Sequence, residues 1–205
     1  MYDILYSKDV TLVEILFSDD NIVVCLKPVG LDSEHELPQQ LARQLGGEIF
    51  TLHRLDQNVG GVMVYARNKK TAGALSRVIQ DNQMIKEYMA KVHGDVPAAG
   101  DWEDLLFKDS RRNKVFVVDR ERNGVKKARL EFKRLQPGLV QIRLHTGRSH
   151  QIRVQFSSRG FPLVGDHKYG ARDNVTAPML YSFRITFPYQ GQIITFSHMP
   201  DWAKE

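Results

Sequence analysis

Short apolar or alternating segments recur along the chain between turn residues, a pattern that predicts a protein rich in β-strands. The stretch P-Y-Q-G-Q separates the last two segments and is typical of a hairpin connection. The segments expected to form strands are residues 12–17, 22–26, 62–66, 84–92, 114–118, 128–135, 139–144, 180–187 and 193–196.

Helical spacing of apolar residues occurs in three other segments. These are residues 37–45, residues 70–80 and a stretch that begins near Ser149. In the first segment a leucine recurs at every fourth position and a Gly-Gly pair follows, as at a helix C-terminus. Many strands with about three helices predict an α+β fold built on a largely antiparallel mixed sheet.

Size and composition indicate an ordinary globular protein. The chain has 205 residues, of which 42% are hydrophobic and 26% charged, so we expect a single domain. Cys25 is the only cysteine, which excludes an internal disulfide and argues for the reducing cytoplasm. The N-terminus does not resemble an export signal, and no segment has the length of a membrane span. Without a sustained heptad repeat, we expect a monomer.

Positive charge is concentrated in one part of the chain. Residues 108–159 carry fifteen Lys and Arg against four Asp and Glu, whereas the remaining residues carry fourteen against twenty. An isolated basic cluster is usually a solvated surface, but about fifty consecutive residues of this character favour a nucleic-acid partner.

The first candidate site segment is T-L-H-R-L-D-Q-N-V-G-G-V-M-V-Y-A-R, residues 51–67. A polar loop with His53, Arg54 and Asp56 precedes two glycines and a strand that we expect to be buried, an arrangement that can present a catalytic group on a rigid support. Taken alone, an acidic loop residue before glycines is more often a simple turn.

The second segment is I-K-E-Y-M-A-K-V-H-G, residues 85–94. On a strand, Lys86 and Tyr88 would share one face, which places an aromatic ring beside a cation. Taken alone, Tyr88 would be a core tyrosine.

The third segment is L-H-T-G-R-S-H-Q-I-R-V-Q-F, residues 144–156, followed by G-F-P-L-V-G-D-H-K-Y-G. We expect Thr146 or Ser149 to cap a helix that carries His150, Gln151 and Arg153 in its first turns. Such a helix start attracts anions, aided by Arg148.

The histidines of this segment raise the alternative of a metal site. His145, His150 and His167 match no common ligand spacing, and the neighbouring arginines would repel a cation. We therefore expect no metal.

Together, these motifs resemble the RluA-type family of pseudouridine synthases, which modify large-subunit ribosomal RNA or transfer RNA. The matching motifs are H-R-L-D at 53–56, K-E-Y-M-A-K-V-H-G at 86–94, G-R-S-H-Q-I-R-V at 147–154 and P-L-V-G-D-H-K-Y-G at 162–170. By order and spacing the resemblance covers about residues 12–198. It implies one catalytic domain over residues 1–205, without the separate N-terminal RNA-binding domain of many relatives.

The resemblance also implies roles for individual residues. Asp56 is the catalytic carboxylate, Arg153 its ion-pair partner, and Tyr88 the residue that stacks on the target base and assists removal of the C5 proton. Arg54 fills the space that the extruded uridine leaves, or clamps a phosphate, and His53 supports the loop. Further RNA contacts are expected from Lys86, Arg148, His150 and Gln151. The reaction needs no cofactor and no metal.

One departure from the family pattern lies beside the proposed catalytic residue. Many members have Thr-Ser-Gly where this chain has Val59-Gly60-Gly61, so two hydroxyls are missing and the loop is expected to grip the RNA backbone differently. Two alternatives remain at this level: an inactive RNA-binding protein on the same fold, and a hydrolase of RNA or nucleotides that uses His53 with Asp56.

Overall fold

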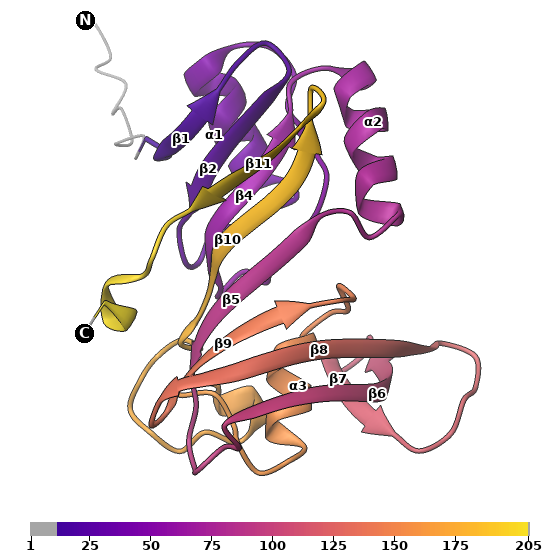
Figure 1. Cartoon of the computed structure of the whole chain (residues 1–205), viewed down its shortest axis with the longest axis vertical. Helices are drawn as coiled ribbons and strands as arrows, with labels where there is room; N and C mark the ends of the chain where they lie inside the picture. The colour runs from indigo at the N-terminus through magenta and orange to yellow at the C-terminus, as the bar shows by residue number, and fades with distance from the viewer. Residues whose placement is uncertain (1–11, 205) are drawn as a thin grey trace, which may run out of the picture.

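A computed structural model describes residues 12–204, in which eleven strands form one sheet (Figure 1). The N-terminal stretch that the sequence analysis judged unlike an export signal, residues 1–11, lies outside the described residues. The strands are β1 (Ile15–Ser18), β2 (Ile22–Lys27), β3 (Phe50–Thr51), β4 (Gly60–Ala66), β5 (Ile85–Lys91), β6 (Ala99–Asp109), β7 (Lys114–Val118), β8 (Val125–Gln136), β9 (Leu139–Leu144), β10 (Leu180–Tyr189) and β11 (Gln192–Ser197).

Three α-helices accompany the sheet: α1 (Glu36–Leu45), α2 (Lys69–Gln80) and α3 (Gln151–Ser157). Two short 3-10 turns lie at His167–Tyr169 and Asp201–Ala203. The predicted α+β class is therefore confirmed. Among the helices of the described region, none is long and apolar enough to cross a bilayer.

The strand order is β1-β2-β4-β10-β5-β9-β8-β6-β7, with β11 paired to β10 and β3 paired to β4. Each of these pairings is antiparallel except the short parallel contact in which Gly60 and Gly61 of β4 meet Tyr181 and Ser182 of β10. The expected largely antiparallel mixed sheet is confirmed. β10 and β11 form the predicted hairpin, whose two connecting residues, Gln190 and Gly191, both have positive φ.

The helices cover the sheet because their apolar residues pack on alternating strand positions. Leu37 and Leu41 of α1 pack with Val23 and Cys25 of β2, whereas Leu75 of α2 joins the cluster that contains Val24. Because alternate residues of a strand point to opposite faces, α1 and α2 lie on opposite faces of β2. Ile152 and Phe156 of α3 belong to the same cluster as α1, so α1 and α3 share a face.

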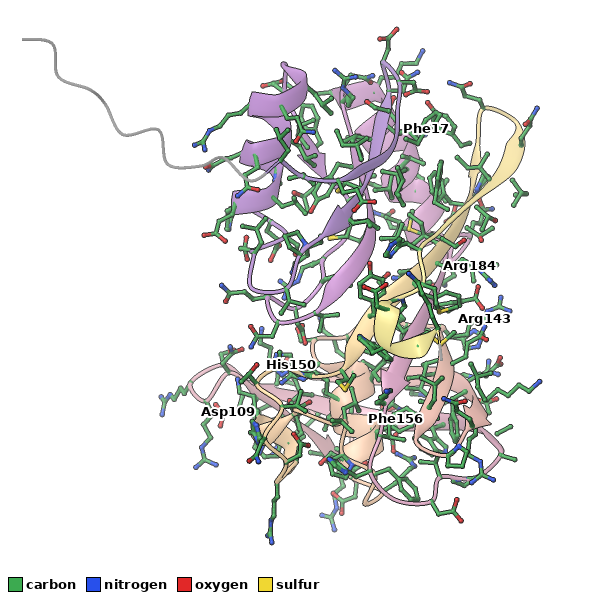
Figure 2. The ribbon with its side chains drawn as sticks, turned by 90° about the vertical axis from the view of Figure 1, so that its left-hand side faces the viewer. Phe17, Asp109, Arg143, His150, Phe156 and Arg184 are labelled. Carbon is green, nitrogen blue, oxygen red and sulfur yellow. The ribbon has the colours of Figure 1, made fainter. Side chains whose placement is uncertain are left out.

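Figure 2 shows the result from the side: Phe156 and His150 lie in the half of the molecule that α3 occupies, and Phe17 lies in the other half. The sheet continues through both halves, and the strands at their junction are β10, β5 and β9. The residues of the predicted site come from this junction.

Two strands were missing from the sequence prediction, the two-residue β3 and the long β6. β6 has eleven residues, of which only Leu106 is fully buried, and its segment A-G-D-W-E-D-L-L-F-K-D carries four acidic residues. Acidic residues and an exposed surface conceal the apolar alternation that predicts a strand. The nine predicted strands are all present, with ends that shift by a few residues.

Candidate functional site

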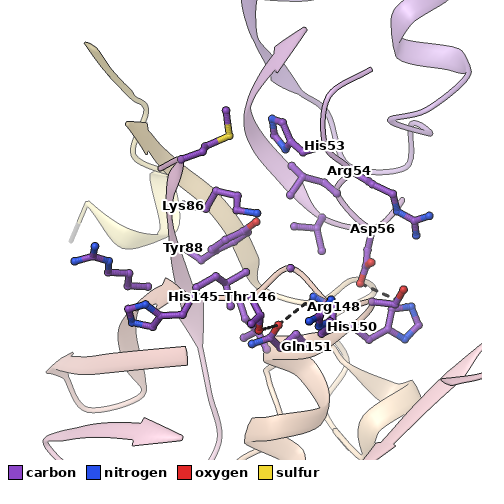
Figure 3. A pocket seen from close by; sticks show the side chains of 18 of the residues that line it. His53, Arg54, Asp56, Lys86, Tyr88, His145, Thr146, Arg148, His150 and Gln151 are labelled. Carbon is purple, nitrogen blue, oxygen red and sulfur yellow. Dashed lines mark hydrogen bonds and ion pairs between the residues drawn. The ribbon is translucent and has the colours of Figure 1, made fainter. Parts of the chain in front are cut away.

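A cavity of about 440 Å³ lies where the three candidate segments meet (Figure 3). Each segment contributes to its wall from a different element: the loop before β4, strand β5, and the turn that leads into α3. All nine residues proposed from the sequence line it: His53, Arg54, Asp56, Lys86, Tyr88, Arg148, His150, Gln151 and Arg153.

The predicted ion pair between Asp56 and Arg153 is present. Nη1 of Arg153 donates to Oδ2 of Asp56 over 3.0 Å, although 97 positions separate the two residues in the chain. The guanidinium is almost fully buried, and the pKa of Arg153 is raised because the gain from the carboxylates beside it exceeds the cost of burial. The pair therefore places an anionic oxygen at the wall of the cavity, where Asp56 remains about one-fifth exposed.

A second carboxylate, which was not predicted, holds the other side of the guanidinium. Asp166 accepts from Nε of Arg153 at 2.7 Å and from Nη2 at 2.8 Å, and its side chain is 1% exposed. This two-point contact fixes the plane and direction of the guanidinium. Asp166 lies in the motif P-L-V-G-D-H-K-Y-G, which the sequence analysis quoted. The motif drew attention to this segment, but the sequence did not show that Asp166 contacts Arg153.

The Asp56 loop is held from below by a buried cation. Lys27, which is 1% exposed, donates from Nζ to the carbonyl oxygens of Pro28, Gln57 and Val59 at 2.8–2.9 Å. Burial lowers the pKa of Lys27 to about 8, so the ammonium is still predominantly charged at neutral pH. Lys27 follows an apolar strand and gave no sign of this function in the sequence.

The Val59-Gly60-Gly61 departure lies where the cavity wall meets the core. Val59 is 1% exposed, and a Cβ at Gly60 would meet the carbonyl oxygen of Lys27 at 3.2 Å. Gly61 has φ 127° and packs directly on the backbone of Ser182, which leaves no room for a side chain. Val59 packs in the core behind the cavity wall, and the expectation that the two missing hydroxyls change the grip on the RNA backbone stays a prediction.

His53 ties the loop to β4, as expected for a supporting residue. Its Nε2 accepts from the backbone N–H of Val64 at 3.3 Å. Burial, with a smaller contribution from the charge of Lys86, lowers the pKa of His53 to about 3. A histidine with this pKa and this bond is not a general base for Asp56, so the geometry does not favour the hydrolase hypothesis.

Arg54 lies at the rim of the cavity and points outward. Its side chain is 54% exposed and its guanidinium pairs with Glu34 at 3.0 Å. An exposed ion pair of this kind is worth little and opens readily. Arg54 is thus available to a ligand that enters the cavity.

Tyr88 and Lys86 project from β5 into the same cavity, as the strand alternation predicted (Figure 3). Tyr88 is 6% exposed, and burial together with the charge of Asp56 raises the pKa of its hydroxyl. The phenol is therefore protonated at neutral pH.

The predicted cap of the third helix is wrong. Neither Thr146 nor Ser149 caps α3, and His150 precedes the helix in the left-handed conformation with φ 50°. Instead, Oε1 of Gln151 accepts from the Thr146 hydroxyl at 2.8 Å and from the Arg148 backbone N–H at 3.0 Å. A side chain in the helix thus binds groups of the preceding turn, whereas we expected a side chain of the turn to bind the start of the helix.

A chain of hydrogen bonds orients His150 towards Asp56. The Tyr169 hydroxyl accepts from the Val115 backbone N–H and lies 2.8 Å from Nδ1 of His150. When Tyr169 donates to Nδ1, the proton of the neutral imidazole resides on Nε2, which lies 3.8 Å from Oδ2 of Asp56. Burial lowers the pKa of His150 despite the attraction of Asp56, which favours this neutral form.

The three histidines weighed as metal ligands lie in different environments. His145 is 2.9 Å from Glu131, His150 bonds to Tyr169, and both ring nitrogens of His167 face backbone carbonyls. Within residues 12–204, no group of three or more His, Cys, Asp or Glu side chains has the geometry to hold a metal ion.

The charge of the cavity wall is predominantly positive. Among the described residues that line it, Asp56 is the one carboxylate, and five are cationic: Arg54, Lys86, Arg143, Arg148 and Arg153. A concave surface of this composition attracts an anionic ligand and offers it one carboxylate.

Comparison with known proteins agrees with these features. Residues 21–158 match the model of the RNA pseudouridylate synthase family. The dual-specificity RNA pseudouridine synthase RluA of Vibrio vulnificus is 33% identical over 178 residues, covering 80% of this chain and 71% of the relative. The ribosomal large subunit pseudouridine synthase D of Pseudomonas aeruginosa is 30% identical, covering 81% of this chain and 56% of the relative.

Solved structures show the same fold. Human RNA pseudouridylate synthase domain containing 1 superposes with a TM-score of 0.81 at 23% identity, covering 96% of this chain and 86% of that one. The matched family model spans most of the chain and includes all nine proposed site residues. The chain therefore belongs to the RNA pseudouridylate synthase family.

Proposed function

We propose that the chain isomerises specific uridines of ribosomal or transfer RNA to pseudouridine, with Asp56 as the catalytic carboxylate. The observation that carries this proposal is the contact of 3.0 Å between Arg153 and Asp56 at the wall of a cationic cavity. Related proteins whose names specify large-subunit ribosomal RNA or tRNA position 32 support these two RNA classes as substrates.

The reaction needs an anionic carboxylate beside the ribose. The bond between N1 and C1′ breaks, the uracil turns, and C5 bonds to C1′, while C5 loses a proton and N1 gains one. Asp56 acts either as the nucleophile at C1′ or as the base that starts glycal formation. Arg153 serves both routes because its guanidinium holds the carboxylate of Asp56 in place through a contact of 3.0 Å.

The target uridine must leave its stack before Asp56 can reach C1′. Extrusion costs a few kcal/mol and is easiest in loops and at mismatches. The cavity volume of about 440 Å³ is in the usual range for small-ligand sites and suits an extruded nucleotide. Arg54 at the rim fills the vacated space or clamps a neighbouring phosphate after it leaves Glu34.

Tyr88 stacks on the uracil in this scheme. Its hydroxyl is protonated because burial and Asp56 raise its pKa, and a protonated phenol is a poor acceptor for the C5 proton. The stacking role is therefore the better supported of the two roles considered for this residue.

Tritium release from RNA labelled at C5 of uridine tests the proposal. RNA from cells that lack the protein should release tritium with the wild-type chain and none above background with Asp56→Asn. RNA length and mass should remain unchanged apart from the exchanged isotope. Equal inertness of both proteins would support an RNA-binding role, and shortened RNA or free uracil would support a hydrolase.

A further inference from the structure

The ammonium of Lys86 lacks a partner within the described chain. It lines the cavity, yet no side chain of residues 12–204 forms an ion pair with it and no carbonyl accepts from it. Burial lowers its pKa, with no neighbouring carboxylate to oppose the change. A cation that is partly removed from water without compensation costs free energy, which a bound anion would recover.

Gly147 leaves the space in which this ammonium lies. A Cβ at Gly147 would be 3.2 Å from Nζ of Lys86, so the ammonium lies against bare backbone. Gly147 has no positive φ, so backbone conformation does not demand a glycine at this position. The missing side chain instead keeps the ammonium open towards the cavity.

His53 also lines the cavity, and it supplies no counter-charge to Lys86. Because Val64 donates to Nε2, the neutral imidazole carries its proton on Nδ1, and this buried atom has no partner in the described chain. Burial, and then the charge of Lys86, holds the pKa of His53 at about 3, so the ring is neutral at physiological pH. Because Nδ1 of His53 is buried, the ammonium of Lys86 is the donor that a ligand can reach on this side of the cavity.

The position of Lys86 separates it from the reacting carbon. Figure 3 shows Lys86 and Tyr88 on the left of the cavity and Asp56 and His150 on the right. The cavity continues past Lys86 to Ile79, Asn82 and Met84 at the end of α2. In the proposed function the base lies on Tyr88 and the ribose at Asp56, so the Lys86 end of the cavity is left for another part of the RNA.

We propose that Lys86, in the space left by Gly147, forms a subsite for a non-bridging phosphate oxygen of the RNA backbone next to the target nucleotide. An ammonium without a protein acceptor favours an anionic oxygen, and it binds phosphate as a point charge. This inference rests on the proposed function because it requires RNA in the cavity. It assigns the phosphate contact to a named atom, Nζ of Lys86.

Salt-dependent binding tests the subsite without turnover. In the Asp56→Asn background, the affinity for a uridine pentanucleotide is measured across a range of salt concentrations with and without Lys86→Met, which retains an apolar stem. Each phosphate neutralised on a single strand contributes about 0.7 to the slope of log K against log salt. Lys86→Met should therefore reduce the slope by about 0.7. Lys86→Gln, which is neutral but polar, should do the same.

Lys70→Met is the matched control, because Lys70 is exposed on α2 and its loss changes the net charge equally. It should leave the slope unchanged. A pentanucleotide of abasic riboses keeps the phosphates without the bases, and Lys86→Met should weaken its binding by the same factor. An unchanged slope, an equal effect of Lys70→Met, or a loss confined to the uridine oligomer would overturn the proposal.

The two proposals fail in different experiments. Lack of tritium release by the wild-type protein would reject the isomerase function, whatever the salt slopes are. An unaltered slope in Lys86→Met would reject the phosphate subsite even in an active enzyme.

Discussion

Arg153 is the residue on which the geometry of the site depends most. Its guanidinium lies between two carboxylates, Asp56 and Asp166, and both contacts are largely shielded from water. Loss of the guanidinium alone would leave two negative charges facing each other at the base of the cavity. A buried charge left without its partner is among the most destabilising changes in a protein.

Arg153→Met should therefore lower the free energy of unfolding by about 3 to 5 kcal/mol, as measured by urea denaturation. Combining it with Asp166→Asn removes one of the stranded charges, so the double variant should be more stable than the sum of the single effects predicts. Strict additivity of the two substitutions would contradict this account of the ion pairs.

His53 makes stability depend on pH in a known direction. Its pKa is about 3 in the folded protein and about 6.5 when unfolded, so between these values only the unfolded chain binds the proton. Stability from the neutral ring is thus complete above about pH 6.5 and declines as the pH falls towards 3.

Between pH 7.5 and 5.0 the wild-type protein should lose about 2 kcal/mol more unfolding free energy than His53→Gln, which has no titrating ring. Chemical denaturation at the two pH values measures the difference. Parallel losses in the two proteins would show that His53 titrates normally in the fold.

At the scale of elements, the loop that carries Asp56 is fastened on two sides. Lys27 of β2 binds its carbonyl oxygens from below, and Ser33 exchanges hydrogen bonds with the backbone of Leu55. A catalytic side chain is positioned most precisely when packing and hydrogen bonds fix the residues that hold it.

Lys27→Met should release this loop while keeping the apolar packing of the lysine stem. The freed carbonyl groups of Gln57 and Val59 would lack a donor, which costs about 1 to 3 kcal/mol for each buried group. We expect faster hydrogen exchange at the amides of residues 56–59 and slower tritium release at saturating RNA. Unaltered exchange at these amides would show that Lys27 does not hold the loop.

Gly61 marks the point where β4 and β10 run closest together. Gly61→Ala would place a methyl group on the backbone of Ser182 at φ 127°, so we expect a loss of more than about 3 kcal/mol or failure to fold. Gly73→Ala is the control: it lies in α2 with open space around its Cβ, and should stabilise by about 0.5–1 kcal/mol. Equal effects of the two substitutions in thermal unfolding would refute the close contact.

Sequence patterns predicted the elements well where one face is buried and poorly where it is not. β4 is buried throughout and was evident, whereas β6 has few buried positions and was missed. The cap of α3 was wrong because Gln151, inside the helix, satisfies the turn before it. Such a reversal depends on the left-handed backbone at His150, which sequence spacing does not reveal.

At the scale of the whole molecule, the site is a junction between distant parts of the chain. Asp56, Tyr88 and Arg153 come from three elements, and the continuous sheet brings them together. Their proximity was predicted from the family resemblance that the three motifs carry. The support residues Lys27, Asp166 and Tyr169 were not, because their contacts depend on packing that a linear pattern does not encode.

The structure also revises how much of the positive charge is free. Within the basic stretch, Arg129 pairs with Asp101 and Glu131, Arg134 with Asp95, and Arg159 with Asp104. Three of these carboxylates precede residue 108, so counting charges by sequence segment separated partners that are neighbours in the structure. The cavity wall, rather than the whole stretch, is the clearest anion-binding surface.

Mapping pseudouridine across total RNA tests the central claim most directly. Cells that lack the protein are compared with the same cells complemented by the wild-type chain or by Asp56→Asn at equal abundance. The account predicts that one or more positions in ribosomal or transfer RNA lose pseudouridine, and that only the wild-type chain restores them. An unchanged map, or restoration by Asp56→Asn, would contradict it.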